Sequence, residues 1–267
     1  MQESDQVTRL MNNLSRKNLD VESSLVSDIK YRNLKIAYQP AYYLDHYRPF
    51  FLEALVRWPG QTISPSIFIP VAEESGAIYD LNDYLLEEVC HQIGLWHKDN
   101  IRYPVSINLS SHLLYDEYYV NHMLSFLKKN IFTSRNIIFE ITENSVDIND
   151  VNISLIKFLK KSGFQIAIDQ YGTGYSSLSF LNNICPDIIK IDNSFIQNIN
   201  RDNMSITMIT TCIAVARKLS IDLVIGGVEK IDQLEWLISE GAESIQGFLL
   251  HKPQYPEYYS SYGFDVK

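Results

Sequence analysis

The sequence alternates short apolar runs with longer amphipathic stretches from residue 34 to residue 246. In chain order the apolar runs are 34–38, 50–56, 105–109, 137–141, 164–168, 188–191, 223–225 and 244–246. Most of them are too short for helices, and their nearly continuous hydrophobicity is typical of strands in a parallel sheet covered on both faces. The stretches between them repeat apolar residues at helical spacing, most clearly in 80–96, 115–129, 151–162, 204–219 and 231–240.

Eight strands that alternate with helices over this length predict an α/β fold of the closed (β/α)8 barrel type. An open, doubly wound sheet is the alternative, because periodicity alone does not show whether a sheet closes. No repeat, low-complexity tract or flexible linker interrupts the pattern, which favours a single domain over residues 19–267. Residues 1–18 stand apart as a short amphipathic extension, with Val7, Leu10, Met11 and Leu14 at helical spacing.

The charge balance excludes one class of function. The chain of 267 residues carries 23 Lys and Arg against 32 Asp and Glu, a formal net charge of −9, whereas nonspecific nucleic-acid binding needs an excess of positive charge. Its apolar runs are far shorter than the roughly 20 residues of a spanning helix, and its polar start lacks a signal-peptide core. We expect a soluble, cytoplasmic protein that binds neither nucleic acid directly nor a membrane. Cys90, Cys185 and Cys212 are expected to be core residues rather than disulfide partners or zinc ligands.

Six polar residues lie in or at the end of apolar runs: Glu53, Asn108, Glu140, Asp169, Lys190 and Gln246. In a barrel the carboxyl ends of the strands meet at one mouth, so these side chains are expected to gather there. A carboxylate in an apolar strand is costly unless it is paired or bound to a cation. Three acids and an amide oxygen suit a hard ion, and magnesium is favoured over zinc because the set contains no His or Cys. For any one of these residues taken alone, a strand end that faces water is the better explanation. For the three acids and Asn108 together, a cation site is the better explanation.

A glycine-rich turn follows Asp169 and reads Gly172-Thr173-Gly174-Tyr175-Ser176-Ser177. Such a turn between a strand and a helix can present backbone N–H groups to phosphate, and it can equally be an ordinary tight turn. It is not a P-loop, because the Gly-Lys-Ser/Thr ending is absent.

Ordered motifs along most of the chain resemble those of one known family. They are Glu53-Ala54-Leu55 with Val56-Arg57-Trp58, Ile63-Ser64-Pro65, Phe68-Ile69-Pro70, Ala72-Glu73-Glu74, Ile107-Asn108-Leu109-Ser110, Glu140-Ile141-Thr142-Glu143, Gly172 to Leu178, Ile189-Lys190-Ile191-Asp192 and Gln246-Gly247-Phe248. Together they cover roughly residues 19–253, and in this order they resemble the EAL domain family.

The resemblance implies a modified TIM barrel that binds the bacterial second messenger cyclic di-GMP. Active members of the family hydrolyse it to pGpG with two divalent cations, usually Mg²⁺ or Mn²⁺, and a metal-activated water. By position it implies first-metal ligands at Glu53, Asn108, Glu140 and Asp169, with Lys190 orienting the attacking water.

The resemblance also assigns residues around the nucleotide. It implies a phosphate contact for Arg57 and a bracing role for Glu143 under the loop after Asp169. It implies nucleotide-pocket positions for Gln39, Asn108, Glu229 and Gln246, although Gln39 and Gln246 are also explained as partners of backbone groups at the barrel mouth. In an active enzyme Glu53 and Lys190 would be the catalytic residues.

Two positions depart from the family pattern. Active members carry an Asp where this chain has Gln170 and a Glu where it has Gly226. In the family these two acids help hold the second metal, and the Glu has also been assigned a general-base role. Three remaining carboxylates neutralise about one dication, whereas two dications about 4 Å apart repel by roughly 16 kcal/mol at an effective dielectric constant of 20. We therefore predict one Mg²⁺ or Mn²⁺ ion rather than two.

Three functions compete on this evidence. We favour a degenerate EAL module, a regulator that binds cyclic di-GMP, a protein partner or both without efficient hydrolysis. The alternative is an active cyclic di-GMP phosphodiesterase that tolerates the two substitutions. A purely structural interaction domain is disfavoured because Arg57, Asn108 and Lys190 remain. Family members often form dimers near the helix after the glycine-rich loop, so a homodimer is also an expectation.

Overall fold

The computed structural model describes residues 19–61, 63–130, 136–145, 150–174, 178–199 and 202–264. By internal contacts the chain divides into two compact units, Met1–Ile36 with Val56–Glu88 and Ala37–Leu55 with Val89–Lys267. The predicted amphipathic extension, residues 1–18, lies outside the described residues, as do Tyr175, Ser176 and Ser177 of the glycine-rich turn. Every helix in the described ranges is too short or too polar to cross a membrane.

Eight strands form a closed barrel in the order in which they follow one another along the chain. They are β1 (Lys35–Tyr43), β2 (Pro49–Arg57), β3 (Val105–Asn108), β4 (Ile137–Thr142), β5 (Gln165–Tyr171), β6 (Ile188–Ile191), β7 (Asp222–Ile225) and β8 (Ser244–Gln246). The predicted barrel is confirmed, and the alternative of an open sheet is wrong because β1 pairs with β8.

The direction of β1 corrects the expectation of a parallel sheet. Strands β2 to β8 pair in parallel with their neighbours, but β1 is antiparallel to β8, with Ala41 opposite Gln246. A parallel pair needs a crossover of about a dozen residues or more. The link from β1 to β2 is far shorter and turns back sharply, as the Tyr43 N–H donates to the Arg48 carbonyl at 3.0 Å. The chain therefore enters the barrel as a hairpin.

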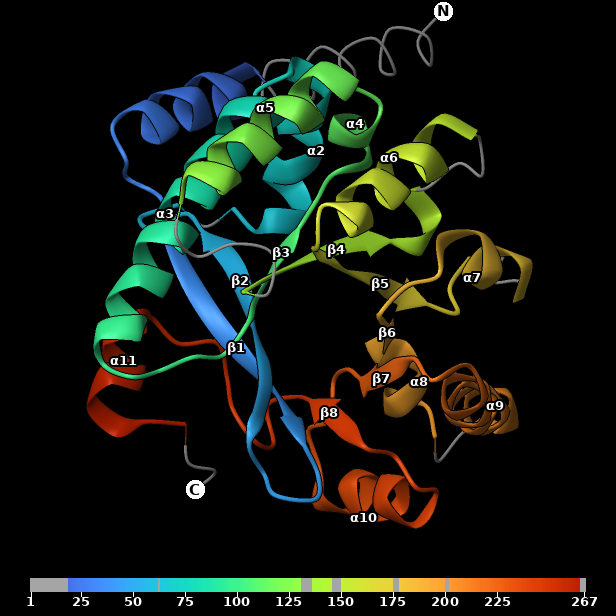
Figure 1. The fold of residues 1–267 in the computed structure, drawn as a ribbon. Helices are drawn as coiled ribbons and strands as arrows, with labels where there is room; N and C mark the ends of the chain where they lie inside the picture. Colours follow the sequence, from blue (N-terminus) through green and yellow to red (C-terminus); the bar gives the residue numbers. More distant parts are fainter. Residues whose placement is uncertain are drawn as a thin grey trace, which may run out of the picture. The chain divides into compact units, whose positions relative to one another are not determined.

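The helices that follow β4 to β8 lie on the outer side of the barrel strands (Figure 1). In chain order the helices are α2 (Pro65–Ser75), α3 (Ile78–Lys98), α4 (Ser111–Leu114), α5 (Glu117–Lys129), α6 (Asp150–Lys161), α7 (Leu178–Ile184), α8 (Asn193–Gln197), α9 (Asn203–Leu219), α10 (Ile231–Ser239) and α11 (Pro256–Tyr262). Side-chain caps set the start of α5, where Asp116 accepts from the Tyr119 N–H, and of α9, where Asp202 accepts from the Met204 N–H. The helix predicted from residue 115 begins at Glu117 for this reason.

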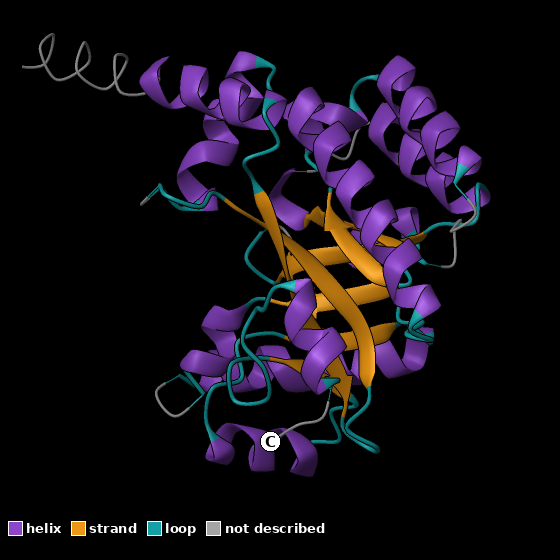
Figure 2. Cartoon of the chain, turned by 90° about the vertical axis from the view of Figure 1, so that its left-hand side faces the viewer, coloured by secondary structure: helices purple, strands orange, loops and turns teal. Residues whose placement is uncertain are grey.

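The apolar core of the barrel lies directly beneath the polar residues at the carboxyl ends of the strands. A buried cluster takes one side chain from each of six strands: Ala41, Phe51, Ile138, Ala167, Ile188 and Val224. Successive strand side chains alternate between the two faces of a sheet, so residues two apart share a face. Glu140 follows Ile138 by two positions, and Lys190 follows Ile188 in the same way. The strands, drawn in orange in Figure 2, thus carry the polar residues on the same inner face, one layer above the apolar core.

The unit formed by Met1–Ile36 and Val56–Glu88 has its own helical packing. Residues 19–30 are helical, and Leu25 is fully buried. Polar contacts join this helix to later segments of the same unit: the Trp58 indole N–H donates to Asp28 at 2.6 Å, and Arg32 forms an ion pair with Glu87 at 2.8 Å. These contacts hold residues 19–36 on the segment that follows β2.

The cysteines differ from the expectation at one position. Cys90 and Cys212 are buried, as predicted, but Cys185 is exposed. Cys185 follows the end of α7 with a positive φ of 50°, and its thiol donates to the Asn182 carbonyl at 3.0 Å. The prediction failed there because the apolar neighbours belong to a helix end, where the turn leaves the residue between them facing water.

Candidate functional site

The site is built around the buried ammonium group of Lys190 on β6. Its Nζ atom lies 2.8 Å from Glu53 Oε2, 2.5 Å from Glu140 Oε2 and 3.7 Å from Asp169 Oδ1. These carboxylates come from β2, β4 and β5, and Lys190 is 4% exposed. Four strands far apart in the sequence therefore place one positive and three negative groups at a single point.

Amide groups complete the surroundings of Glu53. Asn108, the last residue of β3, donates to Glu53 Oε1 at 3.1 Å. Gln246, the last residue of β8, donates to Glu53 Oε2 at 2.9 Å and to the Gln39 carbonyl at 3.4 Å. The Gln39 side chain itself donates to the His251 carbonyl at 3.1 Å. The structure therefore brings together all six polar residues found at the ends of the apolar runs, and it shows Gln39 and Gln246 bonded to backbone groups.

The electrostatics of Glu140 are those of a carboxylate without enough partners. Burial raises its pKa, the nearby Glu53 and Asp169 carboxylates raise it further against the attraction of Lys190, and the pKa reaches about 8. The Oε2 atom of Glu140 accepts a hydrogen bond from Lys190, whereas Oε1 is buried and has no hydrogen-bond partner among the described residues. A buried oxygen atom of this kind is costly unless a further donor or cation meets it.

The pKa values of the other charged groups shift in different directions. Burial tends to raise the pKa of Glu53, but the attraction of Lys190 and the hydrogen bonds it receives outweigh burial, so the pKa is lowered. Burial raises the pKa of Asp169. Burial alone would lower the pKa of Lys190, yet the three carboxylates raise it well above the ordinary value. Lys190 is thus a permanent cation of the site.

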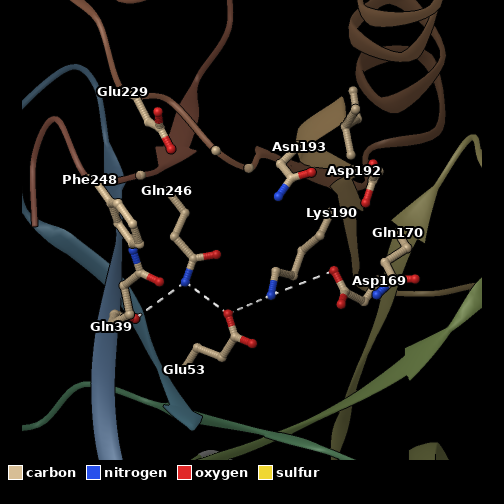
Figure 3. A pocket seen from close by; sticks show the side chains of 14 residues that line it. Gln39, Glu53, Asp169, Gln170, Lys190, Asp192, Asn193, Glu229, Gln246 and Phe248 are labelled. Carbon is tan, nitrogen blue, oxygen red and sulfur yellow. Dashed lines mark hydrogen bonds and ion pairs between the residues drawn. The ribbon is translucent and has the colours of Figure 1, made fainter. Parts of the chain in front are cut away.

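A pocket of about 290 Å³ opens over this cluster at the carboxyl ends of the strands (Figure 3). It is lined by Gln39, Glu53, Asp169, Gln170, Lys190, Ile191, Asp192, Asn193, Gly226, Gly227, Glu229, Gln246, Gly247 and Phe248. Asp192, Asn193 and Phe248 were not among the site residues predicted from the sequence. Their positions could have indicated this, since Asp192 and Asn193 directly follow β6 and Phe248 is the second residue after β8.

The two positions that depart from the family pattern both lie in the wall of this pocket. Gln170 has a positive φ of 55°, a conformation that Asp and Asn adopt more readily than most residues. Gly226 is not held at positive φ, and a Cβ atom there would meet the Ile191 carbonyl oxygen at 3.1 Å. A side chain at residue 226 therefore needs the Ile191 carbonyl to shift by a few tenths of an ångström.

Glu143 lies beneath the glycine-rich turn. Its Oε2 atom accepts the Gly172 N–H at 2.9 Å and the Gly174 N–H at 3.3 Å. A Cβ atom at Gly174 would come within 2.2 Å of the Asn144 side-chain oxygen, so that side chain would have to move if another residue replaced the glycine. The carboxylate thus holds the described part of the turn that follows Asp169.

Glu229 and Arg57 are the remaining residues predicted to bind the nucleotide. Glu229 lines the pocket, but its side chain is exposed and only its backbone N–H has a described bond, to Gln233 Oε1 at 2.8 Å. Arg57 belongs to the unit that contains Val56–Glu88, and its guanidinium donates to the Val56 carbonyl at 3.0 Å. Its phosphate contact stays a prediction.

Gly247 and Gly226 provide a matched pair for testing the pocket wall. A Cβ atom at Gly247 would lie 2.0 Å from the Val228 carbonyl oxygen and 2.4 Å from its nitrogen. Because backbone cannot yield as a side chain does, we expect Gly247→Ala to lower the free energy of unfolding by about 3 kcal/mol, the upper end for overpacking. Gly226→Ala should change it by less than about 1 kcal/mol. Urea unfolding of both variants checks this; equal losses would contradict the described packing.

Comparison with known proteins finds a matching domain model and similar sequences. A model of the EAL domain matches residues 22–253. The "Probable cyclic di-GMP phosphodiesterase PdeG" of Escherichia coli (strain K12) is 36% identical over 209 residues, which are 76% of this chain and 41% of that protein. This chain therefore spans about two fifths of the length of that relative.

Solved structures also resemble the chain. The "PaMucR Phosphodiesterase, c-di-GMP complex" superposes with a TM-score of 0.81 at 31% identity, covering 88% of this chain and 98% of that chain. A manganese and cyclic di-GMP complex of Klebsiella pneumoniae BlrP1 superposes with a TM-score of 0.72 at 27% identity, covering 84% of this chain and 56% of that one.

Proposed function

The chain belongs to the EAL domain family, and on that premise we propose that it binds cyclic di-GMP as a regulator and hydrolyses it very slowly or not at all. The main observation that supports this proposal is a contrast between the floor and the wall of one pocket. The cluster of Glu53, Glu140 and Lys190 is intact at its floor, whereas Gln170 and Gly226 put no carboxylate in its wall. Cyclic di-GMP is the ligand of choice because relatives are named for binding or hydrolysing it.

The donor set suits one divalent ion. When ionised, the three carboxylates and the Lys190 ammonium sum to a net charge of −2, which one dication neutralises. Glu140 Oε1 is an unpartnered buried oxygen, and carboxylate and amide oxygens are the ligands that Mg²⁺ and Mn²⁺ prefer. We therefore propose that Glu53, Asn108, Glu140 and Asp169 would hold one Mg²⁺ or Mn²⁺ ion. Such an ion, when bound, would supply Lewis-acid polarisation of a phosphate oxygen and a more acidic water.

The chain's own residues would bind and orient the dinucleotide. The Lys190 ammonium is the positive group at the pocket floor, placed to receive a phosphate or to hold a water by hydrogen bonding. Gln246 and Asn108 donate hydrogen bonds to the two oxygens of the Glu53 carboxylate and orient it beside Lys190. Arg57 would contact a phosphate, as the family resemblance implies.

The alternative function is an active cyclic di-GMP phosphodiesterase. It is supported by the names of relatives, including one that is 36% identical. The two proposals are separated by incubating the protein with cyclic di-GMP and either Mg²⁺ or Mn²⁺ and following pGpG by chromatography. We expect turnover far below the roughly 1 to 10 per second of an ordinary enzyme. Turnover within that range would overturn the regulator and establish the phosphodiesterase.

A regulator without efficient hydrolysis would act through what it binds. We propose that the ligand-bound chain acts on a protein partner, and a homodimer is a further proposal carried over from the family. Size-exclusion chromatography with light scattering, run with and without cyclic di-GMP, tests the homodimer; a monomer in both conditions would rule it out.

A further inference from the structure

Lys190 affects cation binding as well as nucleotide binding in the pocket, an inference that rests on the proposed function. We propose that Lys190 couples cation binding to ligand binding: its ammonium opposes a divalent ion until an anionic ligand enters and draws the ammonium toward itself. The divalent ion and the nucleotide would then each bind more tightly in the presence of the other.

The first support is the orientation of the carboxylates. Oxygen atoms of Glu53, Glu140 and Asp169 all face the Lys190 Nζ atom, at 2.8, 2.5 and 3.7 Å. In the described ranges, no three acidic, His or Cys side chains are arranged to hold a metal ion. The carboxylates are therefore set for the ammonium, and a divalent ion needs them to turn from it.

The second support is burial. Glu140 Oε1 is unpartnered and offers an incoming ion a carboxylate oxygen, but Lys190 is bound to Oε2 of the same group. Lys190 is 4% exposed, so water screens little of the repulsion between its charge and that of the ion. The resident ammonium thus weakens the site for a divalent ion without blocking it.

The third support is the charge of the pocket lining. Among the fourteen described residues that line it, Lys190 is the only cation, and four are acidic: Glu53, Asp169, Asp192 and Glu229. An anionic phosphodiester that enters has Lys190 as its positive partner in this lining. Contact with a phosphate would move or neutralise the ammonium and relieve the opposition to the divalent ion. By linkage, the factor by which ligand strengthens cation binding equals the factor by which the cation strengthens ligand binding.

The test measures Mn²⁺ affinity by calorimetry, with and without cyclic di-GMP, for wild type, Lys190→Met and Lys218→Met. Lys218 is an exposed residue at the end of α9, away from the pocket lining, and controls for the loss of one positive charge. In wild type and Lys218→Met we expect cyclic di-GMP to raise Mn²⁺ affinity roughly 10-fold. Lys190→Met should bind Mn²⁺ alone roughly 10-fold more tightly than wild type, and the coupling should fall below about 3-fold.

The proposal is overturned if Lys190→Met binds Mn²⁺ no more tightly than wild type, or if its coupling is unchanged. Lys190→Gln replaces Lys190→Met if thermal unfolding shows that the latter is not folded, with the same expected results. Failure of wild type to bind cyclic di-GMP would defeat the proposed function and with it the coupling. Comparing Mn²⁺ affinities without nucleotide would still decide whether Lys190 opposes the ion.

Discussion

Combining Gln170→Asp with Gly226→Glu in one chain should raise pGpG production at least roughly 100-fold over wild type, a fall of about 2.7 kcal/mol in the activation barrier. The reason is charge. With all three carboxylates ionised, as in a cation-bound site, the wild-type cluster and its one ammonium sum to a net charge of −2, enough for one dication. Two added carboxylates bring the sum to −4, enough for two, and a second ion stabilises the charge that develops on the leaving oxygen.

The backbone dihedral angles at both positions are compatible with the new residues, although the Ile191 carbonyl must shift slightly to admit a side chain at residue 226. Gln170 lies at a φ of 55°, where Asp is tolerated, and Gly226 avoids the positive-φ region, where a side chain would be strained. Each single variant should recover less than about 10-fold, because two ligands of one ion act as a unit. Production of pGpG with Mg²⁺ and with Mn²⁺ is the measurement. A folded double variant no faster than either single variant would contradict the loss of a second-cation site as the cause of weak turnover.

Replacing Glu140 with Ala should remove the Mg²⁺-dependent part of cyclic di-GMP binding and weaken affinity at least roughly 10-fold, about 1.4 kcal/mol. Glu140 offers the one buried carboxylate oxygen that lacks a partner in the described site, and its loss takes away one of the three carboxylates that can ionise around a bound ion. Glu140→Gln keeps the shape and removes the charge, so it should weaken binding to a similar degree. Calorimetric titration with cyclic di-GMP in Mg²⁺ measures both variants.

A control at an exposed acid separates local from general charge effects. Glu235 lies exposed on α10, outside the pocket lining, and Glu235→Ala should bind as wild type does. Thermal unfolding establishes that the Glu140 variants are folded. Wild-type affinity in folded Glu140→Ala would remove this residue from the proposed cation site.

The pattern of apolar runs predicted the barrel well because strand and helix periodicities are local properties of the sequence. The gathering of Glu53, Asn108 and Glu140 also followed from topology, since the ends of barrel strands converge. The reversed direction of β1 did not follow from its apolar run. It depends on the short link before β2, which is a property of the connection rather than of the strand.

Side-chain interactions within the site were less accessible to sequence reasoning. The spacing of the apolar runs predicted that Lys190 lies among the acids. It did not predict that the ammonium group is within hydrogen-bond distance of Glu53 and Glu140, because that distance depends on the stagger of three strands. Nor did the sequence show that Gly226 avoids a positive φ, although that backbone angle decides whether a carboxylate can be introduced there.

The most direct test of a binding site without efficient hydrolysis is a calorimetric titration of the wild-type protein with cyclic di-GMP, with Mg²⁺ and without it. The nucleotide is recovered afterwards and identified by chromatography. We predict saturable binding at micromolar ligand that is tighter with Mg²⁺, and recovery of intact cyclic di-GMP. Absence of binding up to high micromolar ligand, or conversion to pGpG at roughly 1 to 10 per second, would contradict it.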